Sequence, residues 1–347
     1  MKSGPVINGW DIGGVNIKAA QVDCRDGNPA LIKSTGIPFE IWHNPDDLAG
    51  QLEKAAGSLG VRDDQPHAVT ITAELSDAFR TKREGILFVA NAVKKAFGDL
   101  RVYIYNLNGN FYNIREAEQD PLLCAATNWL ASASCTGIFH RNCILIDVGS
   151  TTTDIIPIVN GKALCEERTD TGRLINKELV YSGVLRTNPN AITKSVPVLG
   201  RDCPLAAEYF TVMGDIYLIL GDITPDTYTC PAPDGREKTI DDARARLARL
   251  VCADTEILPA EEIDNIARYL KERQTEQIAS AIAHVLSGVD TLSEAPAVVT
   301  GTGAFLAERA AKQAGIYNII HWEPEGDMNC LPAFSVASLL KNYLKDD

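Results

Sequence analysis

The chain has 347 residues, of which 45% are hydrophobic and 23% are charged, and its net charge at pH 7 is −13. This composition is that of an ordinary globular protein, long enough for two domains. The negative charge argues against nucleic acid and anionic membranes as partners, because both need a basic surface. A basic cluster, Arg244, Arg246 and Arg249, falls in a predicted helix and is interpreted as a solvated face.

The N-terminal residues, the apolar runs and the cysteines predict a cytoplasmic protein. The N-terminus has no signal-peptide h-region, and no apolar run reaches the roughly 18 residues that a membrane span requires. The nine cysteines form no CxxC pair, so we expect reduced thiols. The expected partners are small-molecule substrates, and a homodimer is left open.

In the first half, strands and helices are expected to alternate, which predicts a mixed α/β sheet. The strands are expected at 6–12, 16–23, 29–34, 67–75 and 101–107. The helices are expected at 46–58, from Ser76 as the cap through Lys82, at 85–97 and at 120–135.

The second half opens with a hairpin around Asp147 and then becomes mostly helical. Helices are expected near 203–220, 239–252 and 259–287, with an exposed loop at 221–238. The segment "APAVVTGTGAF", 295–305, predicts a strand, a glycine turn and a further helix. A last helix is expected at 333–345.

Two distant segments resemble each other: "VINGWDIGGVNIKAAQVD" at 6–23 and "CILIDVGSTTTDIIPIVN" at 143–160. In both, an apolar strand ends in Asp, followed by x-Gly and a polar turn into a second strand. Asp11 aligns with Asp147, and Lys18 aligns with Asp154. The sequence therefore predicts two similar halves.

Each of these turns is suited to a polyphosphate. Glycines let the backbone approach a ligand, and N–H and hydroxyl groups can donate to anionic oxygens. Asp11 and Asp147 could hold hydrated Mg²⁺, which usually contacts few carboxylates. The alternative is a tight hairpin whose hydroxyls only satisfy the turn. The predicted phosphate-binding residues are Gly13, Gly14, Asn16, Lys18, Gly149, Ser150, Thr151, Thr152, Thr153, Gly301, Thr302 and Gly303.

The three elements 9–18, 145–154 and 298–306, in this order, resemble the two phosphate loops and the adenosine motif of the actin, Hsp70 and sugar-kinase superfamily. The resemblance implies two duplicated actin-like (ribonuclease H-like) α/β domains with a cleft between them. The first would comprise 1–142 plus the C-terminal helix, 333–347. The second would comprise 143–332, with a helical insertion at about 200–290.

Within that superfamily, "ILIDVGSTTTDIIPI" is similar to the hydantoinase A and oxoprolinase branch. "TAELSDAF", the following Arg83-Glu84-Gly85 and "ELVYSGVLRTN" resemble the family of tetrahydromethanopterin-linked one-carbon pathway proteins and methanofuran or methylofuran synthases. This resemblance implies a transferase that condenses an aminomethyl-furanmethyl diphosphate with the phenol of tyramine or γ-glutamyltyramine. The product would be an ether, and diphosphate would be the leaving group. Mg²⁺ would be the cofactor, and ATP would not be required.

Such a reaction needs a base for the phenol, whose ordinary pKa is about 10. The candidates are Glu74 and Asp77, which follow the strand "VTIT", and Asp154 is a third catalytic carboxylate; the alternative for the first two is a capping or surface pair. The residues expected to line the substrate, or else to serve only as loop and helix, are Asp170, Arg173, Tyr181, Ser182, Arg186 and Thr187.

Two other functions stay open. One is an ATP-dependent kinase or amide hydrolase, which the "VVTGTGAF" turn favours. The other is a nonenzymatic nucleotide-binding switch. The five histidines show no metal-ligand spacing, so none is assigned to a metal.

Overall fold

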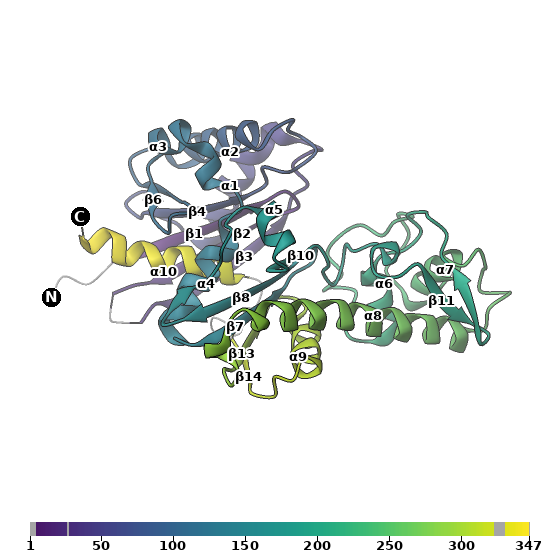
Figure 1. Ribbon diagram of the computed structural model, residues 1–347. Coiled ribbons are helices and arrows are strands. Elements are labelled where there is room, and N and C mark those ends of the chain that lie inside the picture. Colours follow the sequence, from purple (N-terminus) through teal and green to yellow (C-terminus); the bar gives the residue numbers. More distant parts are fainter. Residues whose placement is uncertain (1–4, 26–27, 323–329, 347) are drawn as a thin grey trace. The chain divides into compact units, whose positions relative to one another are not determined.

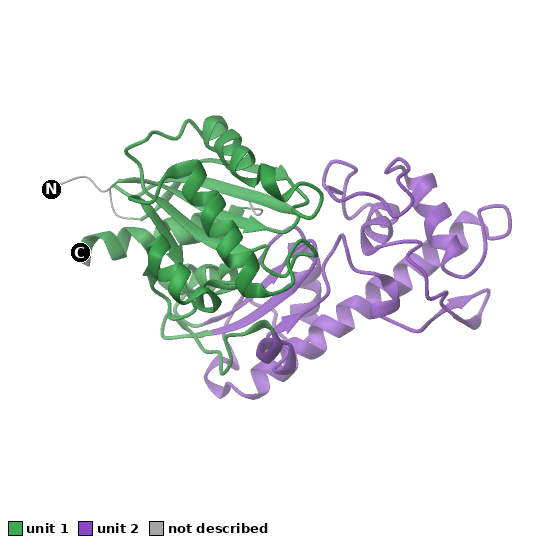
Figure 2. Cartoon of the chain, turned by 90° about the horizontal axis from the view of Figure 1, so that it is seen from above, with its two compact units in different colours: residues 1–142, 158–170, 322–347 green, residues 143–157, 171–321 purple. Residues whose placement is uncertain are grey.

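The computed structural model describes residues 5–25, 28–322 and 330–346. The chain forms two compact units, which Figure 2 colours separately. The first contains residues 1–142, 158–170 and 322–347, and the second contains residues 143–157 and 171–321. The segment 158–170 thus belongs to the first unit, although the sequence analysis assigned it to the second half.

A six-stranded sheet forms the core of the first unit (Figure 1). Its strands are β1 Val6–Gly13, β2 Asn16–Asp23, β3 Ala30–Pro38, β4 His67–Thr72, β5 Val102–Tyr105 and β6 Phe111–Tyr112. They lie in the order β3-β2-β1-β4-β5-β6, with β2 antiparallel to β1, and with β1, β4 and β5 parallel. The carboxyl ends of these three parallel strands therefore meet at one edge, where open α/β sheets bind ligands.

The helices of the first unit are α1 Leu48–Leu59, α2 Lys82–Phe97, α3 Ile114–Gln119, α4 Asn128–Phe139 and α10 Leu331–Asp346, with 3₁₀ turns at Pro45–Asp47 and Pro121–Cys124. Helix α10 packs on β1 and α4. A Cβ at Gly9 would lie 1.8 Å from the carbonyl oxygen of Ala333, so glycine is required for this approach. The helix expected from Ser76 to Lys82 is absent; the helix begins after Thr81, whose side chain caps it by accepting from the Glu84 N–H.

A second mixed sheet has the same arrangement as the first. Its strands are β7 Cys143–Val148, β8 Thr153–Val159, β10 Leu179–Val180, β13 Ala297–Thr300 and β14 Ile319–His321, and β9 Lys162–Ala163 pairs with the end of β8. The order β10-β8-β7-β13-β14, with β7, β13 and β14 parallel, repeats β3-β2-β1-β4-β5. The predicted α/β fold with two related halves is confirmed.

The remaining helices are α5 Asp170–Ile175, α6 Met213–Leu220, α7 Ile240–Arg249, α8 Ala260–Ser287 and α9 Ala304–Gln313, with 3₁₀ turns at Pro189–Ala191 and Asp290–Leu292. A hairpin of β11 Ser195–Val198 and β12 Arg201–Pro204 precedes α6. The prediction of a helix over 203–220 is wrong for its first half. Leu199 and Gly200, with φ of +48° and +76°, make the tight turn of that hairpin.

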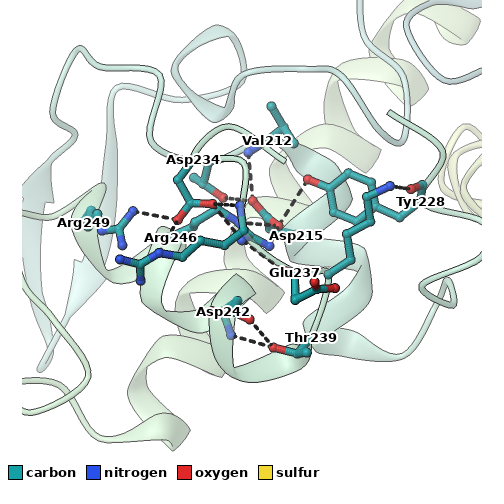
Figure 3. Close-up of polar contacts among 12 residues, drawn as sticks. Val212, Asp215, Tyr228, Asp234, Glu237, Thr239, Asp242, Arg246 and Arg249 are labelled. Carbon is teal, nitrogen blue, oxygen red and sulfur yellow. Dashed lines mark hydrogen bonds and ion pairs between the residues drawn. The ribbon is translucent and has the colours of Figure 1, made fainter. Parts of the chain in front are cut away.

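A buried charge network ties the loop 221–238 to α6 and α7 (Figure 3). Arg246 donates from Nε and Nη2 to Asp215 Oδ1, at 2.9 and 2.7 Å, and from Nη1 to Asp234 Oδ1, at 3.1 Å. The Tyr228 hydroxyl donates to the same Asp215 oxygen. The interpretation of the basic cluster as a solvated face is wrong for Arg246, because 0% of this residue is exposed.

All nine cysteines are free thiols, as expected. Within the described part of the chain, each helix is too short or too polar to cross a lipid bilayer.

Candidate functional site

The turn between β7 and β8 presents hydroxyl and N–H groups beside a carboxylate. Asp147 lies at the end of β7 and is half-buried. The Gly149 N–H donates to the Thr152 carbonyl oxygen at 2.9 Å, which closes the turn. The hydroxyls of Ser150 and Thr151 lie 3.4 Å apart at half-buried positions. This turn can therefore offer donors to an anion.

The segment 182–187 holds this turn in place through backbone hydrogen bonds. The N–H groups of residues 184–186 donate to the carbonyl oxygens of Gly149 and Ser150 at 2.9–3.0 Å. A Cβ at Gly183 would lie 2.5 Å from the Thr151 nitrogen and 2.6 Å from the Gly149 oxygen. Glycine is therefore needed where the two segments cross.

Side chains fix the same segment in place. The Thr153 hydroxyl donates to the Ser182 carbonyl oxygen at 2.7 Å, and the Gly183 N–H donates to Thr187 Oγ1 at 2.8 Å. Buried Gln274 on α8 donates from Nε2 to Ser182 Oγ, at 2.8 Å, and to the Gly183 carbonyl oxygen. Ser182 and Thr187 are 1% and 7% exposed and help to hold this segment in place; that they line the substrate stays a prediction.

The glycine turn after β13 packs against the same strand end. Gly301 has φ of +85°, and a Cβ there would lie 2.3 Å from Asp147 Oδ1. The Gly303 N–H donates to the Val148 carbonyl oxygen at 2.8 Å, and Thr302 between the glycines is half-buried. The second predicted phosphate loop and the predicted adenosine motif thus lie side by side in the second unit.

The donor set suits hydrated Mg²⁺ better than a metal held by protein alone. The described residues contain no group of three or more His, Cys, Asp or Glu side chains that could hold a metal ion. Mg²⁺ usually keeps several waters and uses one or two carboxylates together with substrate phosphates. Asp147, half-buried beside a turn of donors, fits that mode of binding.

Asp154 and Arg173 were expected to have separate roles, and the structure brings them together. Arg173 Nη2 donates to Asp154 Oδ1 at 2.6 Å and to the Glu178 carbonyl oxygen at 3.3 Å. The Arg173 side chain is 1% exposed, so this cation neutralises a buried carboxylate at the start of β8. Of the other expected substrate residues, Tyr181 is 66% exposed and Arg186 is half-buried.

The first predicted phosphate loop lies at the end of β1 in the first unit. Asp11 is 6% exposed, and its Oδ1 lies 3.4 Å from the hydroxyls of both Thr70 and Thr72. Lys18 is the register partner of Asp11 on the antiparallel strand β2, so both side chains are on one face of the sheet. That Asp11 and Asp147 meet at one ligand stays a prediction.

The glycines of this first loop are held by the segment that follows β3. The Ile41 N–H donates to the Gly14 carbonyl oxygen at 3.0 Å. A Cβ at Gly13 would lie 3.0 Å from the Asn16 carbonyl oxygen, and Gly13, Gly14 and Asn16 are half-buried. The loop is therefore tight and reaches the surface.

Glu74, just past the end of β4, is a buried carboxylate. It is 2% exposed, and its Oε2 has no hydrogen-bond partner among the described residues. The pKa of Glu74 is raised to about 7, mainly by burial. A backbone hydrogen bond and the nearby Lys82 ammonium oppose this rise, and Asp170 adds to it. Asp77, the other candidate base, is exposed. The structure therefore distinguishes two carboxylates that the sequence could not.

Three residues important to these sites were missed: Lys82, Gly183 and Gln274. Gly183 lies inside the quoted segment "ELVYSGVLRTN", and a glycine there could have indicated a close approach between two backbone segments. Lys82 and Gln274 reach their partners through tertiary packing, for which the sequence carries no local signal.

A family model for hydantoinase/oxoprolinase matches residues 66–343. The chain belongs to the hydantoinase/oxoprolinase family. This family member is 35% identical over 344 residues to the (4-{4-[2-(gamma-L-glutamylamino)ethyl]phenoxymethyl}furan-2-yl)methanamine synthase of Methanocaldococcus jannaschii, covering 98% of both chains. A synthase of the same name from Methanococcus vannielii is 36% identical over 214 residues, 59% of this chain and 93% of that protein.

These relatives are synthases, so this hydantoinase/oxoprolinase family member is an enzyme. Its fold is also similar to part of the nucleotide-free structure of acetone carboxylase, with a TM-score of 0.50 and 13% sequence identity. The match covers 86% of this chain and 46% of that chain. At this identity the likeness concerns the fold alone.

Substitution of Gly183 by alanine tests the support of the β7–β8 turn in this family member. The added Cβ would meet backbone atoms of Thr151 and Gly149, so the turn must move. We expect the affinity for Mg²⁺-diphosphate, measured by calorimetry, to fall roughly tenfold or more, since small displacements at a site are costly. Gly288→Ala is the matched control, because its Cβ meets only the Val285 oxygen at 3.7 Å. Equal affinities in both variants would contradict the supporting role.

Proposed function

We propose that this protein makes the phenoxymethyl ether of a methanofuran-type product. The substrates would be an aminomethyl-furanmethyl diphosphate and the phenol of tyramine or γ-glutamyltyramine. The bond between the phenol oxygen and the furanmethyl carbon forms, the bond from that carbon to diphosphate breaks, and the diphosphate leaves with the electron pair. The phenol proton passes to a base on the protein.

The observation that carries this proposal is the 35% identity to a synthase over 98% of both chains. The name of that relative describes a phenoxymethyl group attached to a furan. An ether of this kind requires an activated furanmethyl carbon, and diphosphate is a suitable leaving group. A phosphate-binding loop could bind this diphosphate without any use of ATP, which is consistent with the requirement.

The second unit would bind the leaving diphosphate. The N–H groups and hydroxyls of the turn 149–152 can donate to its oxygens, where negative charge develops as it leaves. Asp147 is the residue of this turn that would hold Mg²⁺, which supplies charge neutralisation on the diphosphate. The Gly301-Thr302-Gly303 turn would border the same oxygens, because it packs on Asp147 and Val148.

The first unit would supply the base. A general base is most effective when its pKa lies near the working pH, and burial raises the pKa of Glu74 to about 7. At neutral pH, Glu74 would then be partly ionised and would gain the phenol proton as the ether forms. Oε2, which has no hydrogen-bond partner among the described residues, is the oxygen assigned to this role.

The direct test is to incubate the purified protein with the furanmethyl diphosphate, γ-glutamyltyramine and Mg²⁺. We expect the ether by mass spectrometry and one diphosphate per ether, without added ATP. Asp147→Ala should lose both the product and the calorimetric signal of Mg²⁺-diphosphate binding.

The same experiment decides between the proposal and its alternative. The turn at 301–303 favours a nucleotide, because in this fold it resembles an adenosine motif. Tight binding of ATP with turnover, and no ether, would replace the proposal by an ATP-dependent kinase or amide hydrolase.

A further inference from the structure

Glu74, Lys82 and Asp170 form a charged cluster in the first unit. The Lys82 Nζ lies 3.7 Å from Glu74 Oε1 and 2.8 Å from Asp170 Oδ2. We propose that Lys82 and Asp170 are positioning residues, which hold the Glu74 carboxylate and set the pH at which it becomes a base. This inference rests on the proposed function, in which Glu74 accepts the phenol proton.

The position of Lys82 is fixed by how α2 crosses the Glu74 backbone. Lys82 and Gly85 are three residues apart in the first turns of the helix, so they lie on the same face. A Cβ at position 85 would lie 2.6 Å from Glu74 Cα and 2.9 Å from its carbonyl oxygen. The helix thus packs directly on Glu74, and the lysine stem on that face extends toward the carboxylate.

Asp170 is held independently of α2. Its segment begins at β9, which pairs with the end of β8, and the Arg168 guanidinium donates to the carbonyl oxygen of Leu107 just after β5. The ammonium of a lysine is a compact charge on a flexible stem, so two carboxylates can share it. Asp170 binds this ammonium at 2.8 Å, closer than Glu74 at 3.7 Å, and so competes with Glu74 for its charge.

Lys82 and Asp170 both act on the charge of Glu74, and they act in opposite directions. Lys82 favours the ionised carboxylate, whereas Asp170 opposes it. The other charged side chains of the adjoining turn and helix start, Asp77, Arg80, Arg83 and Glu84, are exposed. Removing Lys82 or Asp170 should therefore move the titration of Glu74 in opposite directions.

The test is the pH dependence of kcat/KM for ether formation in Lys82→Met and Asp170→Asn. Because the base must be ionised, kcat/KM rises with pH through the pKa of Glu74. We expect this rise to move up by about one pH unit in Lys82→Met and to move down in Asp170→Asn. Lys82→Arg keeps the cation, so its pH dependence should stay closer to that of the wild type. Lys95 is an exposed lysine of the same helix, and Lys95→Met should have the pH dependence of the wild type.

A measurement without substrate separates the two proposals. The pH dependence of thermal unfolding should show the same opposite shifts, and both should vanish when Glu74 is also replaced by Gln. If Glu74→Gln keeps full ether formation, the base assignment is wrong. If Glu74→Gln is inactive but the two variants shift together or not at all in both measurements, the positioning role is wrong and the base assignment stands.

Discussion

Replacement of Glu74 by Gln is expected to lower kcat for ether formation by roughly 10²–10⁴-fold, the usual contribution of a general base. Gln has nearly the same shape but cannot accept a proton at neutral pH. The rise of kcat/KM through a pKa of about 7 should disappear in the variant. Binding of Mg²⁺-diphosphate should be unchanged, because this prediction assigns that ligand to residues of the second unit.

The matched control is Asp77→Asn, the neighbouring carboxylate that sequence reasoning could not separate from Glu74. Asp77 is exposed, so its replacement should leave kcat near the wild-type value. The reverse outcome, an active Glu74→Gln and an inactive Asp77→Asn, would transfer the role of base to Asp77.

The same Glu74→Gln variant has an expected effect on stability. The pKa of Glu74 is raised from 4.5 to about 7 in the folded protein, so between these pH values the folded state binds more protons than the unfolded state. The free energy of unfolding therefore falls as pH rises through this window, by about 3 kcal/mol in total. Gln at position 74 should remove that loss, which raises the unfolding temperature relative to wild type above pH 7 but not at pH 4.

Local patterns in the sequence were enough to predict the β7–β8 turn and Glu74. Asp147 and Gly149 follow an apolar strand, and Glu74 follows the strand "VTIT", so each could be placed at a strand end from the sequence alone. In the structure both positions lie at or just past the carboxyl ends of parallel strands, the edge at which open α/β sheets bind ligands. The matching strand order of the two sheets agrees with the predicted duplication.

The side-chain partners could not be predicted in the same way. Asp154 pairs with Arg173 in a buried contact, and Lys82 pairs with Asp170 across 88 positions of sequence. Such contacts depend on tertiary packing, which the hydrophobic periodicity of the sequence does not predict. The hairpin turn at Leu199 was missed for a related reason: leucine disfavours a positive φ, so only the surrounding structure holds it there.

Replacement of Arg246 by Met is expected to have the largest effect on stability. Arg246 and Asp215 are both 0% exposed, and Figure 3 shows the arginine between Asp215 and Asp234. Met fills similar space but leaves a buried carboxylate without its cation. Breaking such a pair typically costs about 3–5 kcal/mol. Urea unfolding should show this loss, and hydrogen exchange should place the faster-exchanging amides in α6 and α7.

Two further variants show whether the loss comes from the unpaired charge. Arg249→Met removes a partly exposed arginine that also contacts Asp234, so it should cost about 1 kcal/mol or less. In Arg246→Met combined with Asp215→Leu, no buried charge of this pair remains, so the double variant should be less destabilised than the sum of the single ones. If the losses simply add, the cost of Arg246→Met reflects lost packing between α7 and α6, and the charge of Asp215 contributes little to it.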